Sequence, residues 1–102
     1  MLALRSSCEH CNKALSPDSL EARICSNECT FCNDCVETVL HNVCPNCGVG
    51  FCQRPIRPAQ HWESDNYLAE DPATNKVTYS PVDVKTHQVF SQELKHLAPE
   101  NR

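Results

Sequence analysis

Short apolar stretches alternate with polar turns in the first half of the chain. Residues 22–25 and 29–32 read Ala-Arg-Ile-Cys and Cys-Thr-Phe-Cys, and the polar triplet 26–28 separates them. Two such stretches around a polar turn predict a short β-hairpin. From Asn33, a suitable N-cap, apolar residues recur at helical spacing as far as Val43, which predicts up to two turns of amphipathic helix. The side chains expected to form a small core between these elements are Leu15, Leu20, Ile24, Phe31, Val36, Val39 and Leu40.

The second half is polar until a helical pattern returns near the C-terminus. Residues 70–75 form a turn pattern, and residues 76–79 predict a short strand. Residues 81–97 predict a helix that ends before Pro99. Its apolar side needs cover, either from the first half of the chain or from a second copy, which would give a homodimer through this helix. Docking on another protein is the alternative. The apolar side consists of Val82, Val89, Phe90, Leu94 and Leu97.

The cysteine distribution divides the chain in two. All nine cysteines lie between Cys8 and Cys52, whereas residues 53–102 contain none and hold five of the seven prolines. With three Phe, two Tyr and one Trp in the whole chain, the first half cannot bury enough apolar area to fold without cross-links. We expect a small α+β module over residues 1–53, an Arg/Pro linker over 54–60, and a polar segment with a C-terminal helical appendage over 61–102.

The compartment decides which cross-link the cysteines form. No apolar leader follows Met1, and no stretch approaches the roughly 20 apolar residues of a membrane span. These features predict a cytoplasmic location without membrane contact. Thiols in such a reducing compartment bind metal more often than they form disulfides.

Four close pairs of cysteines predict two metal sites. A gap of two or three residues lets both thiolates of a tight turn reach one ion at about 2.3 Å. Pro45 sets the last of these turns, and Gly48 permits a positive backbone angle after it. A closed set of four thiolates leaves no position open for a substrate, so the sites predict two structural zinc ions. An iron–sulfur centre is the alternative, whereas a redox-active pair would need a βαβ context that is absent here.

Two assignments of the pairs to the ions are open. Cys29, Cys32 and Cys35 are so close that sequential sites, with Cys29 closing one and Cys32 opening the next, would crowd the two ions. Crossed ligation relieves the crowding and is favoured. It places Cys35 in the first helical turn, where the helix dipole stabilises a thiolate. In the crossed arrangement site 1 is Cys8, Cys11, Cys32 and Cys35, and site 2 is Cys25, Cys29, Cys44 and Cys47.

The order of pairs, Phe31 directly before Cys32, and the ending 44–47 (Cys-Pro-Asn-Cys) resemble a treble-clef or RING-type cross-brace. That resemblance implies recruitment of a ubiquitin-conjugating enzyme. The functional residues of the family do not carry over, because Glu9 and His10 stand where it presents an apolar residue. Gly48 stands where the family often has a cation.

A second resemblance covers residues 1–58. The residues that carry it are Met1, Leu2, Leu4, Arg5, Cys8, Glu9, Cys11, Arg23, Ile24, Cys25, Ser26, Glu28, Cys29, Thr30, Phe31, Cys32, Cys35, Cys44, Pro45, Asn46, Cys47, Gly48, Arg54, Pro55, Arg57 and Pro58. Together they resemble a bacterial family of short cysteine-rich proteins, domain of unknown function family 1272. This resemblance implies a bacterial cytoplasmic zinc protein without an assigned activity.

Several other residues invite a functional interpretation, and each has a simpler one. Cys52, the ninth cysteine, is interpreted as an apolar filler near the core. His10 is expected to be an exposed polar residue, because eight cysteines leave it no vacancy at a metal. Arg54 and Arg57 are interpreted as parts of a stiff linker. Trp62 is expected to pack back on the cysteine-rich half.

The net charge and the absence of catalytic motifs exclude some classes of function. The formal net charge is −4, and thiolate ligation of two divalent ions makes it more negative, which argues against nucleic-acid binding. No phosphate loop, pair of catalytic carboxylates or activated nucleophile is recognisable, so we expect no enzyme. The sequence predicts a zinc-binding protein–protein interaction module. The alternatives are a nucleic-acid-binding zinc module and RING-type ubiquitin-ligase-like recruitment.

Overall fold

A three-stranded antiparallel sheet forms the centre of the computed structural model, which describes residues 2–102. Strand β1 (Ala22–Ile24) pairs with β2 (Thr30–Cys32) on one side and with β3 (Cys52–Gln53) on the other. Arg23 lies opposite Phe31 in β2 and opposite Gln53 in β3. The predicted hairpin is confirmed. Strand β3 was not predicted, since two residues carry no period-2 pattern.

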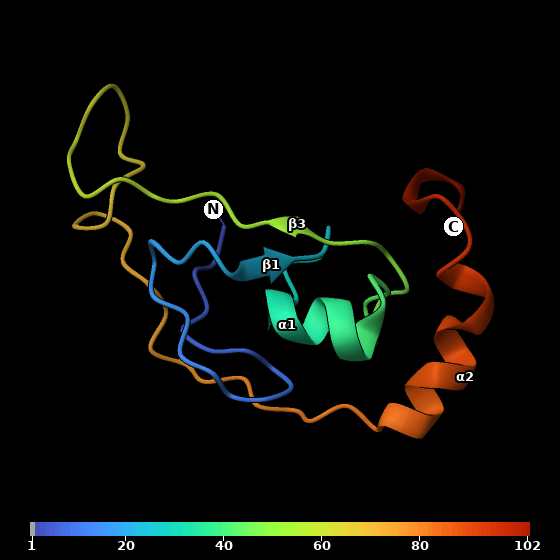
Figure 1. The fold of residues 1–102 in the computed structure, drawn as a ribbon. Helices are drawn as coiled ribbons and strands as arrows, with labels where there is room; N and C mark the ends of the chain where they lie inside the picture. Colours follow the sequence, from blue (N-terminus) through green and yellow to red (C-terminus); the bar gives the residue numbers. More distant parts are fainter. Residues whose placement is uncertain (1) are drawn as a thin grey trace.

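Two short helical segments follow β2 without a break. Helix α1 (Asn33–Cys35) continues into η1 (Val36–Leu40), a turn of π-helix in which the N–H of His41 bonds to the carbonyl of Val36. Figure 1 shows them as one coil beside β1. The predicted helix is present, but its N-cap is Cys32 rather than Asn33. Left-handed backbone at His41 and Asn42 ends it.

The core lies between the sheet and the coil of α1 and η1. Leu15, Phe31 and Leu40 are fully buried, and Phe31 meets Phe51 edge to face with ring centroids 5.5 Å apart. Leu20 is 68% exposed, so its predicted place in the core is wrong. Six of the eight cysteines of the predicted sites belong to the same cluster as these apolar side chains, and the other two, Cys11 and Cys47, are exposed.

After β3 the chain makes a long excursion with little regular structure. Figure 1 shows it running from β3 into a loop at the end of the molecule remote from α2 and returning beneath β1. The strand predicted at 76–79 is absent, because these extended residues find no partner strand. Trp62 is 75% exposed, so its predicted packing on the cysteine-rich half is wrong.

The C-terminal helix is shorter than predicted. Helix α2 (Val84–Leu94) begins after Asp83, whose side chain accepts a hydrogen bond from the backbone N–H of Thr86 at 3.2 Å. This is an N-cap, which fixes the start of the helix three residues after the predicted one. A 3-10 turn, η2 (Pro99–Asn101), follows. None of the helices within residues 2–102 is long and apolar enough to cross a membrane.

Helix α2 packs on the cysteine-rich half through a mixed face that includes two residues of the predicted apolar side, Phe90 and Leu94, together with polar residues. His87 and Ser91 are its buried residues, whereas Val89 is 75% exposed. His87 and Ser91 are four residues apart and share one face of the helix. Phe90 and Leu94, which are only partly covered, lie against Gly48. The close approach of α2 to η1 requires the small Ser91 and a hydrogen-bonding His87 on this face.

The arginines that the sequence assigns to a linker are instead buried, and their guanidinium groups donate hydrogen bonds to backbone carbonyls. This corrects the linker interpretation. Arg54 is 1% exposed and donates to the carbonyls of Arg5 and Ser16 at 2.7 and 2.9 Å. Arg57 is also buried and donates to the carbonyls of Leu2 and Asp71. Burial lowers the pKa of Arg54 because desolvation disfavours the charged guanidinium. Five donors in a rigid fork let one guanidinium bind two backbone segments at once.

Candidate metal centre

Site 1 joins the first cysteine turn to the end of the hairpin. The backbone N–H of Cys8 donates to Lys13 and that of Asn12 donates to Cys8, which closes the turn. Cys32 is the last residue of β2, and Cys35 ends α1 one helical turn later. The four sulfurs lie within 4.8 Å of one another. They belong to Cys8, Cys11, Cys32 and Cys35.

Site 2 joins the hairpin turn to the loop after η1. Cys25 and Cys29 flank the turn of the hairpin, while Cys44 and Cys47 belong to a turn closed by the N–H of Gly48 donating to Cys44 at 2.8 Å. Gly48 has the expected positive φ of 77°. The four sulfurs again lie within 4.8 Å of one another.

These two sets are the ones that crossed ligation requires. Two segments separated along the sequence contribute to each set, and the sets interleave, so the cysteine spacing fits a cross-brace arrangement. In each set three cysteines are buried and one is exposed, Cys11 in site 1 and Cys47 in site 2. Each tetrad can therefore hold a metal ion with one edge near solvent. Occupancy by two ions stays a prediction.

The sulfur separations fit a tetrahedral ion. Cys11 and Cys32 are 3.7 Å apart in site 1, and in site 2 Cys47 lies 3.8 Å from Cys29 and 3.9 Å from Cys25. A tetrahedron with metal–sulfur bonds of about 2.3 Å has edges of about 3.8 Å. A disulfide requires sulfurs at about 2.05 Å. All nine cysteines are free thiols, and the geometry suits tetrahedral coordination.

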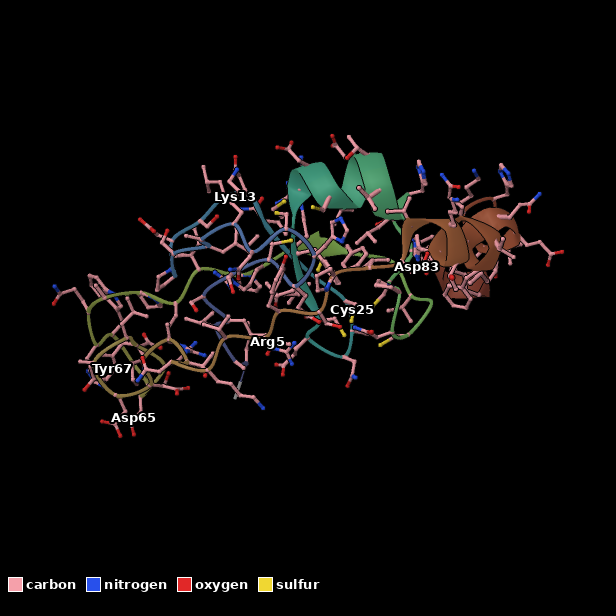
Figure 2. The ribbon with its side chains drawn as sticks, turned by 90° about the horizontal axis from the view of Figure 1, so that it is seen from below. Arg5, Lys13, Cys25, Asp65, Tyr67 and Asp83 are labelled. Carbon is pink, nitrogen blue, oxygen red and sulfur yellow. The ribbon has the colours of Figure 1, made fainter. Side chains whose placement is uncertain are left out.

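Amide groups surround the sulfurs of site 2. The backbone N–H groups of Asn27 and Cys29 both donate to the sulfur of Cys25 at 3.3 Å. The side-chain amide of Asn46 donates to the sulfur of Cys29 at 3.5 Å. Such donors orient thiolate ligands and disperse their charge. Figure 2 shows Cys25 in the middle of the molecule, between the remote loop and α2.

The pKa values of the cysteine thiols differ. Burial raises the pKa of Cys29 to about 11, and it also raises the pKa values of Cys35 and Cys44. Burial acts in the same direction on Cys25, but the N–H groups of Asn27 and Cys29 outweigh it and lower the pKa of that thiol. Thiols must lose their protons to bind metal, so an arriving ion has to displace protons from the buried cysteines.

A buried carboxylate, missed in the sequence, supports site 1. Glu9 is 4% exposed and its Oε2 accepts hydrogen bonds from the backbone N–H of Thr30 at 2.7 Å and from Arg5 at 2.8 Å. The N–H of Glu9 in turn donates to the carbonyl of Thr30 at 3.0 Å. These bonds fix the turn that carries Cys8 and Cys11 against β2. The Arg5-x-x-x-Glu9 spacing was a signal for the ion pair, but not for the contact with Thr30.

His10 and Cys52 differ from the sequence interpretation. His10 is half-buried rather than exposed, and its Nδ1 accepts a hydrogen bond from the N–H of Val82 at 2.9 Å. The N–H of Ser80 donates to the carbonyl of Glu9 at 2.8 Å, so residues 80–82 lie along the first cysteine turn. Cys52 is exposed on β3 and does not fill the core, because the outer edge of this strand faces solvent.

Comparison with known proteins finds similarity over the cysteine-rich half of the chain. A family model described as "Protein of unknown function (DUF1272)" matches residues 1–57. An uncharacterized protein of Rhizobium meliloti (strain 1021) is 56% identical over 59 residues, a stretch that covers 58% of this chain and 70% of that protein. No solved structure matches the chain. Because the family model spans more than half of the 102 residues, the chain belongs to the DUF1272 family of proteins of unknown function.

Proposed function

We propose that the protein binds two structural zinc ions, one in each tetrad, and has no enzymatic activity. The observation that carries this proposal is the grouping of eight sulfurs into two sets of four, within 4.8 Å of one another in each set. Three sulfur pairs in these sets lie 3.7 to 3.9 Å apart, which suits tetrahedral coordination. Bonds of about 2.3 Å to four thiolates are those of zinc. Four protein ligands leave no open position on the ion, so it holds the fold rather than activating a substrate. Thiolate ligation requires a reducing compartment, here the bacterial cytoplasm.

The role that we propose for this scaffold is protein–protein interaction. Large apolar side chains are exposed along and beside α2: Val89 is 75% exposed, Phe90 46% and Leu97 44%. Such side chains on a helix that His87 holds against η1 form a preorganised docking face. The partner is a protein, and a homodimer with a second copy of this chain is one such interaction.

Two other functions receive less support. Nucleic-acid binding needs free cations, yet Arg54 and Arg57 are buried on backbone carbonyls, and Lys13 forms an ion pair with Glu21. Ligase-like recruitment needs an apolar groove beside the first cysteine turn. That turn instead bonds to residues 80–82 of its own chain.

Native mass spectrometry of the chain purified in reducing buffer tests the metal assignment. Two zinc ions per chain are expected, and a single ion or a bound iron–sulfur cluster would refute the proposal. Sedimentation and affinity capture test the interaction. The zinc-loaded chain should form a defined complex that Val89→Glu weakens and that Glu37→Gln, a change on the exposed face of η1, leaves intact. Equal behaviour of both variants would remove α2 from the docking face.

A further inference from the structure

A cavity of about 350 Å³ lies where α2 begins, between the cysteine-rich half and the C-terminal segment. Phe31 and Pro45 line it from one side, and Val82, Asp83, His87 and Phe90 line it from the other. This volume is within the range of sites that bind small ligands or single side chains. The cavity adjoins site 2 through Pro45, which separates Cys44 from Asn46.

Part of the cavity lining is apolar and aromatic. Phe31 is buried, while Phe90 is 46% exposed and presents more of its ring. Val82 and Pro45 complete the apolar lining. Surfaces of this kind take up the carbon chain of a ligand, and the faces of aromatic rings also attract a cation.

The charge at the cavity is negative and comes from the carboxylate of Asp83. Asp83 lies at its rim, and among the described residues no lysine or arginine lines it. Of the carboxylate oxygens of Asp83, Oδ1 caps α2 through Thr86. The side chain is exposed and keeps acceptor capacity for a second partner. The formal charge of −4 on the whole chain favours a positive ligand as well.

His87 lines the cavity from α2. Its Nε2 lies 3.0 Å from the carbonyl oxygen of Leu40, and because a carbonyl only accepts, Nε2 carries the proton. Nδ1 is buried and has no hydrogen-bond partner among the described residues. The imidazole is therefore a fixed part of the lining, and the carboxylate of Asp83 is the acceptor that a ligand in the cavity can reach.

We propose that this cavity binds the lysine side chain of a partner protein. An alkylammonium has an apolar stem for Phe31, Val82 and Phe90. Its charged head has three donors and no acceptor, which matches the exposed carboxylate of Asp83. The inference rests on the proposed role in protein–protein interaction and names the chemistry of the partner at one site.

NMR titration of the zinc-loaded, full-length, ¹⁵N-labelled chain tests the site with n-pentylammonium as the probe. Shift changes are expected at residues 82–90 and at Asn46. Pentanol has the same stem without the charge, and pentanoate carries the opposite charge, so both should bind at least several-fold more weakly. Equal binding of pentanol would overturn the preference for a cation. No response to any probe would overturn the site.

Three variants test which side chains of the cavity bind the probe. Asp83→Asn removes the carboxylate but keeps a good N-cap, so α2 should stay folded while pentylammonium binding weakens about two- to fivefold at low salt. Phe90→Ala should weaken pentylammonium and pentanol alike. Asp65→Asn is the matched control, since Figure 2 shows Asp65 in the remote loop and Asp83 at the start of α2. Equal weakening by both Asp variants would mean non-specific charge attraction and would refute the site.

The outcomes separate this inference from the proposed function. Capture of a partner through α2 without any binding of pentylammonium would remove only the lysine site. Binding of pentylammonium to a chain that forms no complex with another protein would keep the cavity as a cation site but refute the lysine of a protein as its ligand.

Discussion

Nε2 of His87 lies 3.0 Å from the carbonyl oxygen of Leu40, so α2 is hydrogen-bonded to the last residue of η1. Leu40 is the residue before the left-handed turn that ends η1, where backbone carbonyls have no partner within the helix. The imidazole of His87 thereby donates to a carbonyl at the end of η1 and fixes the position of α2. His87 is 3% exposed, and solvent does not replace this bond.

Replacing His87 with leucine should therefore loosen α2 more than it disturbs the metal sites. It removes one of the two donors to the carbonyl of Leu40, which keeps only the backbone N–H of Val43, so the loss costs roughly 0.5–1.5 kcal/mol. Amide hydrogen exchange in α2 should accelerate, while the chain keeps two zinc ions by native mass spectrometry. Gln88→Leu, on the adjacent exposed position, is the control. Unchanged exchange in the His87 variant would show that the bond does not hold the helix.

The ninth cysteine provides a matched pair of substitutions. Cys44→Ser removes a fully buried sulfur from site 2, whereas Cys52→Ser changes an exposed thiol outside both tetrads. A structural zinc contributes roughly 10–16 kcal/mol of apparent binding energy, and a small domain has a margin of only about 5–15 kcal/mol. Cys44→Ser should lose one ion and its cooperative unfolding transition, and Cys52→Ser should keep both. Equal metal content in the two variants would contradict the site.

Zinc affinity should rise with pH. Metal binding requires thiolates, and burial raises the pKa of Cys29 to about 11 and that of Cys44 as well. Below those pKa values protons occupy both sulfurs, and zinc must displace them. Affinity changes about tenfold per pH unit for each proton released, so site 2 should weaken about a hundredfold between pH 7.5 and 6.5. Competition with a chromophoric chelator measures this, and an affinity independent of pH would contradict it.

The sequence predicted what short-range patterns determine. The spacing of the pairs indicated crossed sets of cysteines, and the polar triplet 26–28 indicated the hairpin. Gly48 was expected at a positive φ because the turn after Cys47 needs it. These features depend on a few neighbouring residues whose geometry allows few solutions.

Long-range contacts were not predictable in the same way. Nothing near Arg54 indicates that the carbonyls of Arg5 and Ser16 will surround it, since these acceptors lie 49 and 38 residues away. The apolar pattern of the C-terminal helix indicated the contacts of Phe90 and Leu94 but not the burial of His87, because a bond to a backbone carbonyl leaves no trace in hydropathy. In a chain with so little apolar area, polar contacts decide how the two halves pack.

Arg54 tests that conclusion directly. Arg54→Met keeps much of the apolar stem but removes both charged donors, which leaves the carbonyl of Arg5 unpaired and that of Ser16 with only the N–H of Ser19. Bonds from charged donors contribute roughly 1.5–3 kcal/mol each, so the free energy of unfolding of the zinc-loaded chain should fall by about 3 kcal/mol or more. Chemical denaturation measures it, with Lys76→Met as the exposed control. Similar stability of both variants would mean that the guanidinium is dispensable.

Glu9 lies in the turn that carries two ligands of site 1, and replacing it should affect both stability and zinc release. Glu9→Gln keeps an acceptor for the N–H of Thr30 but loses the charge that binds Arg5, so the zinc-loaded chain should lose about 1–3 kcal/mol of stability. Because the turn is then held less firmly, zinc should leave site 1 faster while the stoichiometry stays at two. Zinc release to a chelator, followed in Glu9→Gln and in the exposed control Glu37→Gln, distinguishes the two effects. If both variants release zinc at the wild-type rate, the buried carboxylate does not support the metal site.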